Sequence, residues 1–119
     1  MSFVEDIGGK EAVKKALQAF HDRISADPSL GGAIDSDLMT ASLAEQCAAL
    51  CAFIDGETDI AAEKMPAAHG FIIGQGMTDD GFDTVYDHYH DSIAELGVPG
   101  GMVHLFLESF EDLREKAVT

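Results

Sequence analysis

The 119-residue chain is strongly acidic, with 22 Asp and Glu against 7 Lys and Arg and a formal net charge of −15. A surface of this charge repels phosphate backbones and anionic lipid head groups, which excludes nucleic acid and membrane surfaces as favoured partners. The length suits a single domain over residues 1–119, and 46% apolar residues give an ordinary globular composition.

The N-terminal region gives no indication of export. Residues 1–6 are acidic where a secretory signal would be basic and then apolar. The chain also has no run of about 18 apolar residues that would span a membrane. We therefore expect a cytoplasmic protein.

The first long helix is predicted over residues 10–25, after a short turn that ends in Gly8 and Gly9. Its apolar residues recur at spacings of four, three and four, which is typical of an amphipathic helix. These residues are Val13, Leu17, Phe20 and Ile24, and His21 lies beside them. Asp27 and Pro28 end the helix.

A second helix is predicted over residues 37–54, after a corner at residues 30–34. The segment Asp35-Ser36-Asp37 is suited to cap its first turn, and Gly56 is suited to end it. One face carries Leu43, Cys47, Leu50 and Ile54, flanked by Ser42 and Gln46. Cys47 and Cys51 are interpreted as small core residues, because their spacing on a helix does not suit a disulfide.

His69 is the candidate metal ligand of the chain. Residues 57–77 are predicted to form a loop with a short helical piece around His69, with Pro66 in its first turn because proline breaks a continuing helix. This places one imidazole at the wall of a cavity, and neutral imidazole is the usual proximal ligand of haem iron. The alternative is a partly buried histidine with a hydrogen-bonded ring.

The C-terminal half shows the strongest helical periodicity. Thr78 is expected to cap a helix whose apolar residues repeat at threes and fours: Phe82, Val85, Tyr86, Tyr89, Ile93 and Leu96. A turn over residues 97–101 leads to a last helix over residues 102–116. No strand-like alternation is present, so the sequence predicts an all-α domain of four main helices.

The order of these parts resembles the truncated haemoglobins, in particular their first group, over nearly the whole chain. That family has a glycine pair after its first helix, a Phe-Tyr-x-Arg-x-x-x-Asp pattern, a Met-x-x-x-His element that carries the proximal haem ligand, a following Phe and a Leu-Gly-Val-Pro-like turn. The matching residues are Gly8 and Gly9, 20–27, Met65 and His69, Phe82, and 96–99. The resemblance implies a globin-like, two-over-two helical sandwich with haem b (iron protoporphyrin IX) on His69.

The resemblance also implies roles for the distal residues. His21 stands where the family usually has a tyrosine that hydrogen-bonds to the iron-bound ligand, and Gln46 stands where a glutamine assists it. Ser42 falls at the distal gate. Donor groups of this kind stabilise the partial negative charge of bound dioxygen. An imidazole at position 21 can instead bind the iron as a neutral sixth ligand if its helix lies close enough, and the donor role is the expected one. Phe82 is expected near the haem, and Tyr86 either lines the pocket or belongs to the core.

Three departures from the family pattern are visible. Ile34 replaces the phenylalanine that packs against haem, and Ala33 replaces the preceding aromatic residue in a corner loosened by Gly31 and Gly32. The family often has a basic residue on the distal helix near the haem propionates, and Glu45 stands at that position here. Lys64 is then the cation nearest in sequence to the proposed site. The chain between His69 and Thr78 is also longer than the family spacing.

The function that the resemblance implies is binding of oxygen or another diatomic gas such as nitric oxide. Any enzyme activity would be at most a haem-dependent nitric oxide dioxygenase type, served by an unidentified reductase. The departures leave a second hypothesis open, in which a globin-fold domain has lost haem and acts as a binding or interaction module. His69 and the distal donors His21 and Gln46 support the haem-binding hypothesis. Ile34 supports the hypothesis that haem has been lost.

Overall fold

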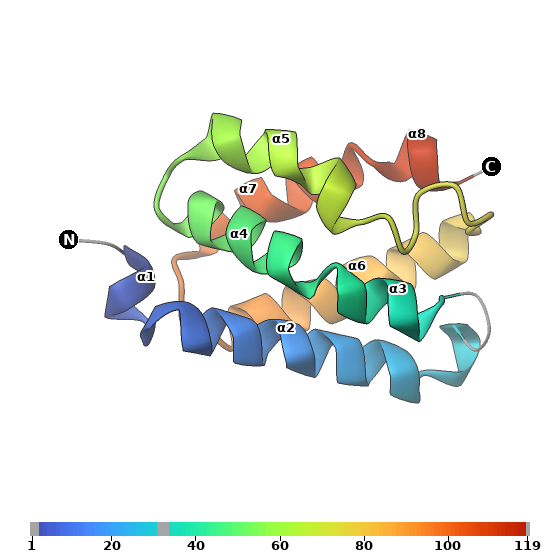
Figure 1. Ribbon diagram of the computed structural model, residues 1–119, viewed down its shortest axis with the longest axis horizontal. Coiled ribbons are helices and arrows are strands. Elements are labelled where there is room, and N and C mark those ends of the chain that lie inside the picture. Colours follow the sequence, from blue (N-terminus) through green and yellow to red (C-terminus); the bar gives the residue numbers. More distant parts are fainter. Residues whose placement is uncertain (1–2, 31–33, 119) are drawn as a thin grey trace.

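The computed structural model describes residues 3–30 and 34–118 (Figure 1). In chain order the elements are α1 (Phe3–Asp6), α2 (Gly9–Ala26), the 3-10 helix η1 (Pro28–Leu30), α3 (Ser36–Ala41), α4 (Leu43–Ile54), α5 (Thr58–Ala68), α6 (Asp79–Ala94), α7 (Gly100–Glu111) and α8 (Arg114–Ala117). Within these ranges the only β pairing is an isolated bridge between Met77 and Val118. The predicted all-α class is therefore confirmed.

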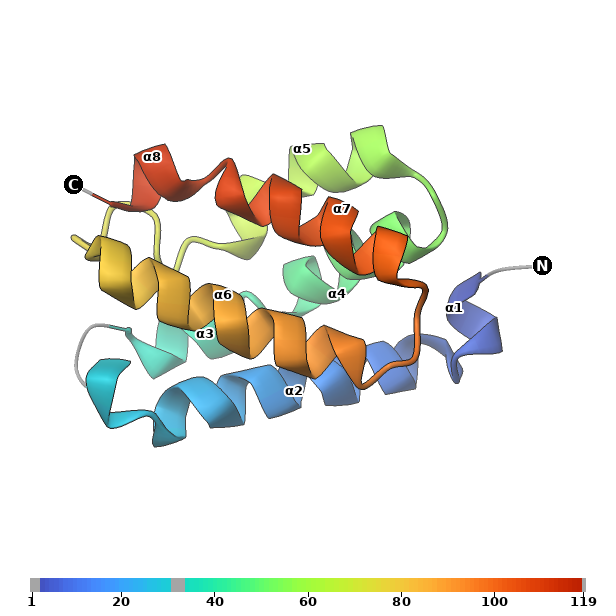
Figure 2. The same cartoon turned by 180° about the vertical axis from the view of Figure 1, so that it is seen from behind.

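Four of the helices form two layers. Helices α2 and α4 lie together on one side of the molecule, and α6 and α7 lie together behind them (Figures 1 and 2). Helix α2 packs against α4 and α6, while α7 packs against α4 and α6, so the two pairs close around one core. Helix α5 lies beside α4 and also contacts α7. This arrangement is a two-over-two helical sandwich.

Several helices begin or end at capping residues that the sequence predicts. The Asp35 carboxylate accepts hydrogen bonds from the backbone N–H groups of Asp37 and Leu38, at 2.9 and 3.1 Å, and so caps α3. The Thr78 hydroxyl caps α6 in the same way, by accepting from the N–H of Gly81 at 3.0 Å. Beyond α4, Gly56 takes a φ of 82°, a conformation that favours glycine.

Two predicted helices are each divided in the structure. The helix predicted over 37–54 breaks at Ser42, which ends α3 and precedes α4; its hydroxyl donates to the Leu38 carbonyl at 2.9 Å. A serine hydroxyl that bonds to the carbonyl four residues earlier often bends a helix, which agrees with the break at this position. The helix predicted over 102–116 likewise becomes α7 and α8, with a turn at residues 112–113.

The prediction for the segment before His69 is wrong. Residues 58–68, predicted to be mainly loop, form α5, and Pro66 lies in its last turn rather than in the first turn of a later piece. Pro66 cannot donate to the carbonyl of Ala62, an exposed residue, and its ring crowds that carbonyl, so this last turn forms despite a local cost. His69 is the C-cap of α5, and its backbone N–H donates to the Pro66 carbonyl at 3.2 Å.

The segment after His69 fastens this C-cap to the core. The N–H groups of Ile72 and Ile73 donate to the His69 carbonyl at 3.0 and 3.1 Å, and Phe71 and Ile72 are fully buried. The long connection to α6 thus holds the histidine instead of loosening it. The predicted loosening at Gly31 and Gly32, and the substitution at Ala33, lie outside the described residues.

Aromatic rings fill the space between the layers. Phe20 of α2 stacks on Tyr89 of α6 with a centroid distance of 3.7 Å, and Tyr89 meets Phe106 and Phe110 of α7 edge to face at 5.1 and 5.0 Å. All four side chains are fully buried. No helix in the described ranges has the length and apolar character needed to cross a membrane.

Candidate functional site

His69 lies at the centre of this core with no solvent exposure. Its Nδ1 is 2.8 Å from the backbone carbonyl oxygen of Met65, one turn back in α5. Its Nε2 is 2.6 Å from the hydroxyl oxygen of Tyr89, which is also fully buried. The imidazole is therefore held at both ring nitrogens, by its own helix on one side and by α6 on the other.

The partners of His69 fix its tautomer. A backbone carbonyl only accepts hydrogen bonds, so Nδ1 carries the proton and donates it to Met65. Burial lowers the pKa of the ring to about 4, and the Met65 bond opposes this shift, so the ring is neutral near pH 7. Nε2 then bears a lone pair and accepts from the Tyr89 hydroxyl, whose pKa is raised by burial.

A second polar chain connects α2, α4 and the end of α5. The Gln46 side-chain Nε2 donates to the Ala68 carbonyl at 3.2 Å, so the Gln46 Oε1 faces away from α5 and toward His21. That oxygen accepts from His21 Nε2 at 2.8 Å, which means that His21 carries its proton on Nε2. Burial lowers the pKa of His21 as well, with the Gln46 bond opposing the shift.

These bonds close the space beside His69. Gln46 joins α4 directly to the residue before His69, and Tyr89 covers the Nε2 lone pair. Phe71 and Phe110 flank the imidazole at centroid distances of 5.8 and 5.1 Å. Four pockets on the described part of the chain have volumes of 250 to 560 Å³, and none of these four is lined by His69, His21 or Gln46.

The structure brings only some of the predicted site residues together. Phe82 is one ring removed from His69, stacked at 4.7 Å on Phe110. Ile34 packs against the core as a partly buried residue. Tyr86 lines a surface pocket between α6 and α7, and Lys64 lines one beside α4. The Ser42 hydroxyl bonds to its own helix, as described above.

Tyr89 is the residue of this site that the sequence analysis assigned only to the apolar stripe of its helix. Its position in that stripe, between Val85 and Ile93, predicts burial, and the structure confirms it. A fully buried tyrosine needs a partner for its hydroxyl. That requirement was the available indication that Tyr89 would meet a polar group of the core.

The buried histidine makes a prediction about pH. Between pH 6.5 and about 4 the unfolded chain binds a proton at His69 that the folded chain does not bind, so the free energy of unfolding should fall as the pH is lowered through this window. We expect a loss of about 2 to 3 kcal/mol from this residue between neutral pH and about pH 4.5. Urea unfolding of wild type and His69→Gln across this range measures it, since Gln does not titrate. Parallel pH profiles for the two proteins would contradict the assignment.

Two layers of paired helices around a buried, neutral imidazole define a protein of the globin class. The chain belongs to the bacterial-like globin family, whose model matches residues 2–119. It is 31% identical over 100 residues to a group 1 truncated hemoglobin of Chlamydomonas moewusii, a match that covers 84% of this chain and 58% of that protein. It is 27% identical over 118 residues to a group 1 truncated hemoglobin of Mycolicibacterium paratuberculosis, covering 99% of this chain and 85% of that protein.

These comparisons confirm the resemblance to the truncated haemoglobins. The chain spans less than two thirds of the length of the Chlamydomonas relative. No solved structure matches the chain.

The donor chemistry of the site suits haem, the group that the family implies. An axial histidine must be neutral, with one nitrogen free of protons and the other held by a hydrogen bond that fixes the ring. His69 has its Nδ1 held by the Met65 carbonyl and its Nε2 free of protons, and in the closed core this Nε2 accepts from the Tyr89 hydroxyl. The Tyr89 bond would have to break, and the aromatic rings beside His69 would have to move, before a planar group could reach His69 Nε2. His69 would hold the iron, and Phe82 and Ile34 are the apolar residues proposed to face the macrocycle.

Proposed function

We propose that this chain is a haem-binding globin that takes haem b on His69 and binds a diatomic gas, oxygen or nitric oxide. One observation carries the proposal: the only proton-free nitrogen of a fully buried, neutral imidazole is aimed into the core by a backbone hydrogen bond. A structural histidine between the Met65 carbonyl and the Tyr89 hydroxyl would have the same tautomer, so haem titration of the protein is what separates the two functions. Haem, when bound, supplies an iron centre for the gas.

The pair of His21 and Gln46 contains a hydrogen-bond donor. His21 holds its proton on Nε2, and Gln46 orients that ring by accepting from it. A protonated Nε2 can donate to an electronegative ligand but cannot ligate a metal. In the closed core this N–H donates to Gln46, so that bond has to open before the proton can reach a bound gas. We assign His21 the donor role in that opened state, in place of the tyrosine that the family usually has, and Gln46 the role of holding the ring in the closed one.

Titration of the purified protein with haem tests this function. The account predicts a Soret band that grows to a sharp end point at a single equivalent. A band that grows without saturation, as for haem adsorbed on a surface, would favour the haem-free module instead. That second candidate function rests on a specific observation: every buried side-chain polar atom in the described part of the chain already has a partner.

His21→Leu should release oxygen faster than wild type, because the N–H that stabilises the partial charge on the gas is gone. A donor of this kind contributes roughly 1.5 to 3 kcal/mol, so we expect an increase of about ten- to a hundredfold in the dissociation rate. Stopped-flow release of oxygen from the ferrous protein measures it. An unchanged rate would place His21 outside the ligand pocket.

Oxidation of nitric oxide by bound oxygen is the reaction class that this site would support. Haem would supply the redox chemistry, and a reductase would be the partner that supplies electrons; this partner is part of the proposal. Consumption of nitric oxide by the oxygenated protein, followed with a nitric oxide electrode, tests the activity. The His21→Leu variant provides the comparison, because the proposed donor is removed.

A further inference from the structure

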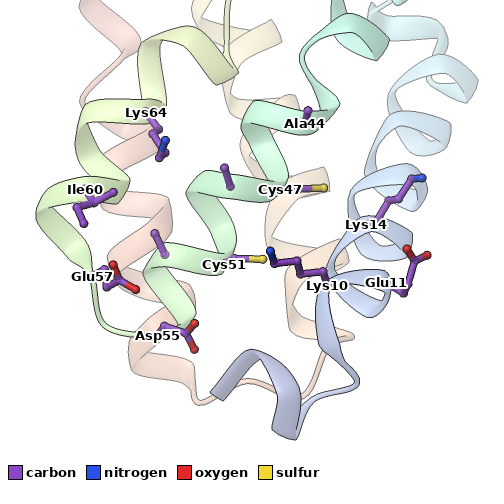
Figure 3. A pocket seen from close by; sticks show the side chains of 12 residues that line it. Lys10, Glu11, Lys14, Ala44, Cys47, Cys51, Asp55, Glu57, Ile60 and Lys64 are labelled. Carbon is purple, nitrogen blue, oxygen red and sulfur yellow. The ribbon is translucent and has the colours of Figure 1, made fainter. Parts of the chain in front are cut away.

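A second site lies on the outer face of α4, away from His69. A pocket of about 560 Å³ runs between the N-terminal part of α2, α4 and α5 (Figure 3). Its volume falls within the range of about 300 to 1,000 Å³ that small-molecule sites occupy. None of the proposed distal or proximal residues lines it.

The floor of this pocket is apolar and made of small side chains. Successive turns of α4 contribute Ala44 and Ala48, Cys47 and Cys51, and Ala52, and α5 adds the half-exposed Ile60. The sequence analysis placed both cysteines in the core, but the structure leaves each of them partly exposed at the floor. Burial raises the pKa of both thiols, so they present neutral S–H groups rather than thiolates. A hydrocarbon chain is the complement of such a floor.

The rim carries cations on both sides. Lys10 and Lys14 come from α2 and Lys64 from α5, which is three of the seven Lys and Arg residues of the chain. Figure 3 shows Lys10 extending over the floor toward Cys51, and the two groups interact electrostatically. Among the described residues, no salt bridge involves Lys10, Lys14 or Lys64.

The arginines of the chain are used differently. Arg23 pairs with Glu95, and Arg114 pairs with Asp79, Asp83 and Glu111. In a protein with 22 acidic residues, three lysines without a carboxylate partner around one apolar pocket leave positive charge available to a ligand.

Three acidic residues also line the pocket, and they lie away from its middle. Glu11 lies near Lys14 on α2 (Figure 3). Asp55 and Glu57 lie together at the end where α4 turns into α5 (Figure 3). The Asp55 carboxylate already accepts from the backbone N–H of Val4 at 3.1 Å. We therefore expect an anionic head group between Lys10 and Lys64, whose side chains reach toward the floor from α2 and α5 (Figure 3).

We propose that this pocket binds a carboxylate amphiphile, a small organic acid with an unbranched apolar chain. The hydrocarbon chain of this ligand lies along the alanine and cysteine floor of α4. Its carboxylate is held by the lysine ammonium groups of α2 and α5. This site uses no residue that the haem proposal requires except Lys64, and its occupancy does not depend on haem.

Decanoate is a suitable probe, and calorimetric titration into the purified full chain is the test. We expect saturable binding in wild type that weakens by about tenfold or more in Lys10→Gln/Lys64→Gln, because each lost ammonium removes a charged contact. The matched control is Lys15→Gln/Lys116→Gln, which removes the same charge outside the pocket and should bind as wild type does. Decanol, which lacks the charge, should bind at least tenfold more weakly than decanoate.

A chemical readout locates the ligand. Saturating decanoate should slow alkylation of Cys47 and Cys51 by iodoacetamide in wild type, and Ala48→Trp, which fills the floor at an exposed position, should abolish decanoate binding while the helical signal remains. The proposal is overturned if wild type does not bind decanoate saturably, if the two lysine double variants weaken equally, or if the cysteines stay unprotected. Haem titration of wild type is a separate measurement, so failure of the decanoate proposal and failure of the haem proposal are distinguishable.

Discussion

His69→Ala should lose saturable haem uptake while keeping its helices. Loss of a hydrogen-bond partner of a metal ligand already costs roughly 10- to 100-fold in affinity, and loss of the ligand itself should cost more. The amphipathic faces of α2, α4, α6 and α7 pack without the imidazole, so the far-ultraviolet circular dichroism should stay helical. Absorption titration with haem and circular dichroism of the same samples measure the two effects.

Two comparison proteins make this result interpretable. His69→Ala leaves a cavity and an unpaired Tyr89 hydroxyl, which should destabilise the fold by a few kcal/mol. His69→Gln keeps a polar side chain near Tyr89 and serves where the Ala variant is too unstable. His104→Ala is the matched control, because His104 is an exposed histidine paired with Glu108 on α7. Equal haem affinity in wild type and His69→Gln would show that His69 is not the ligand.

Tyr89→Phe should bind haem more tightly than wild type. The hydroxyl of Tyr89 occupies Nε2 of His69 in the closed core, and that bond has to break before the nitrogen can reach a metal. Its loss leaves the buried nitrogen unpaired and should destabilise the haem-free protein by about 1 to 3 kcal/mol. The same free energy is returned on haem binding, so the affinity should rise by about five- to a hundredfold.

Urea unfolding of the haem-free protein and haem transfer to an acceptor globin measure the two sides of this balance. Tyr86→Phe is the matched control, since it removes the hydroxyl of the other tyrosine of the chain, which lines a surface pocket. A Tyr89→Phe protein that is destabilised but binds haem more weakly would show that Tyr89 supports the loaded state instead of the closed one.

The sequence was a good guide wherever a local rule determines the structure. The apolar spacing around Phe20 and Phe82 predicted α2 and α6 to within two residues, and Asp35 and Thr78 cap the helices that they were expected to cap. Each of these features depends on neighbours within a few residues. Position along the chain is then enough to specify the contact.

The sequence was a poorer guide where a distant group decides. A proline usually argues for a helix start, but Pro66 lies at the end of α5 because the chain turns inward directly after it to bury His69 and Phe71. The bond from Tyr89 to His69 joins residues 20 apart, and the bond from Gln46 to Ala68 joins residues 22 apart. Periodicity placed Tyr89 in the core but carried no information about which polar group it would meet.

Chemical rescue of His69→Gly tests the central claim most directly. If His69 is the haem ligand, the variant should bind haem poorly on its own, and added imidazole should enter the vacated space and restore a saturable Soret band. The Met65 carbonyl, which accepts from Nδ1 in wild type, remains to orient the free imidazole. A His69→Gly protein that binds haem as wild type does, with a spectrum that imidazole does not change, would contradict the account.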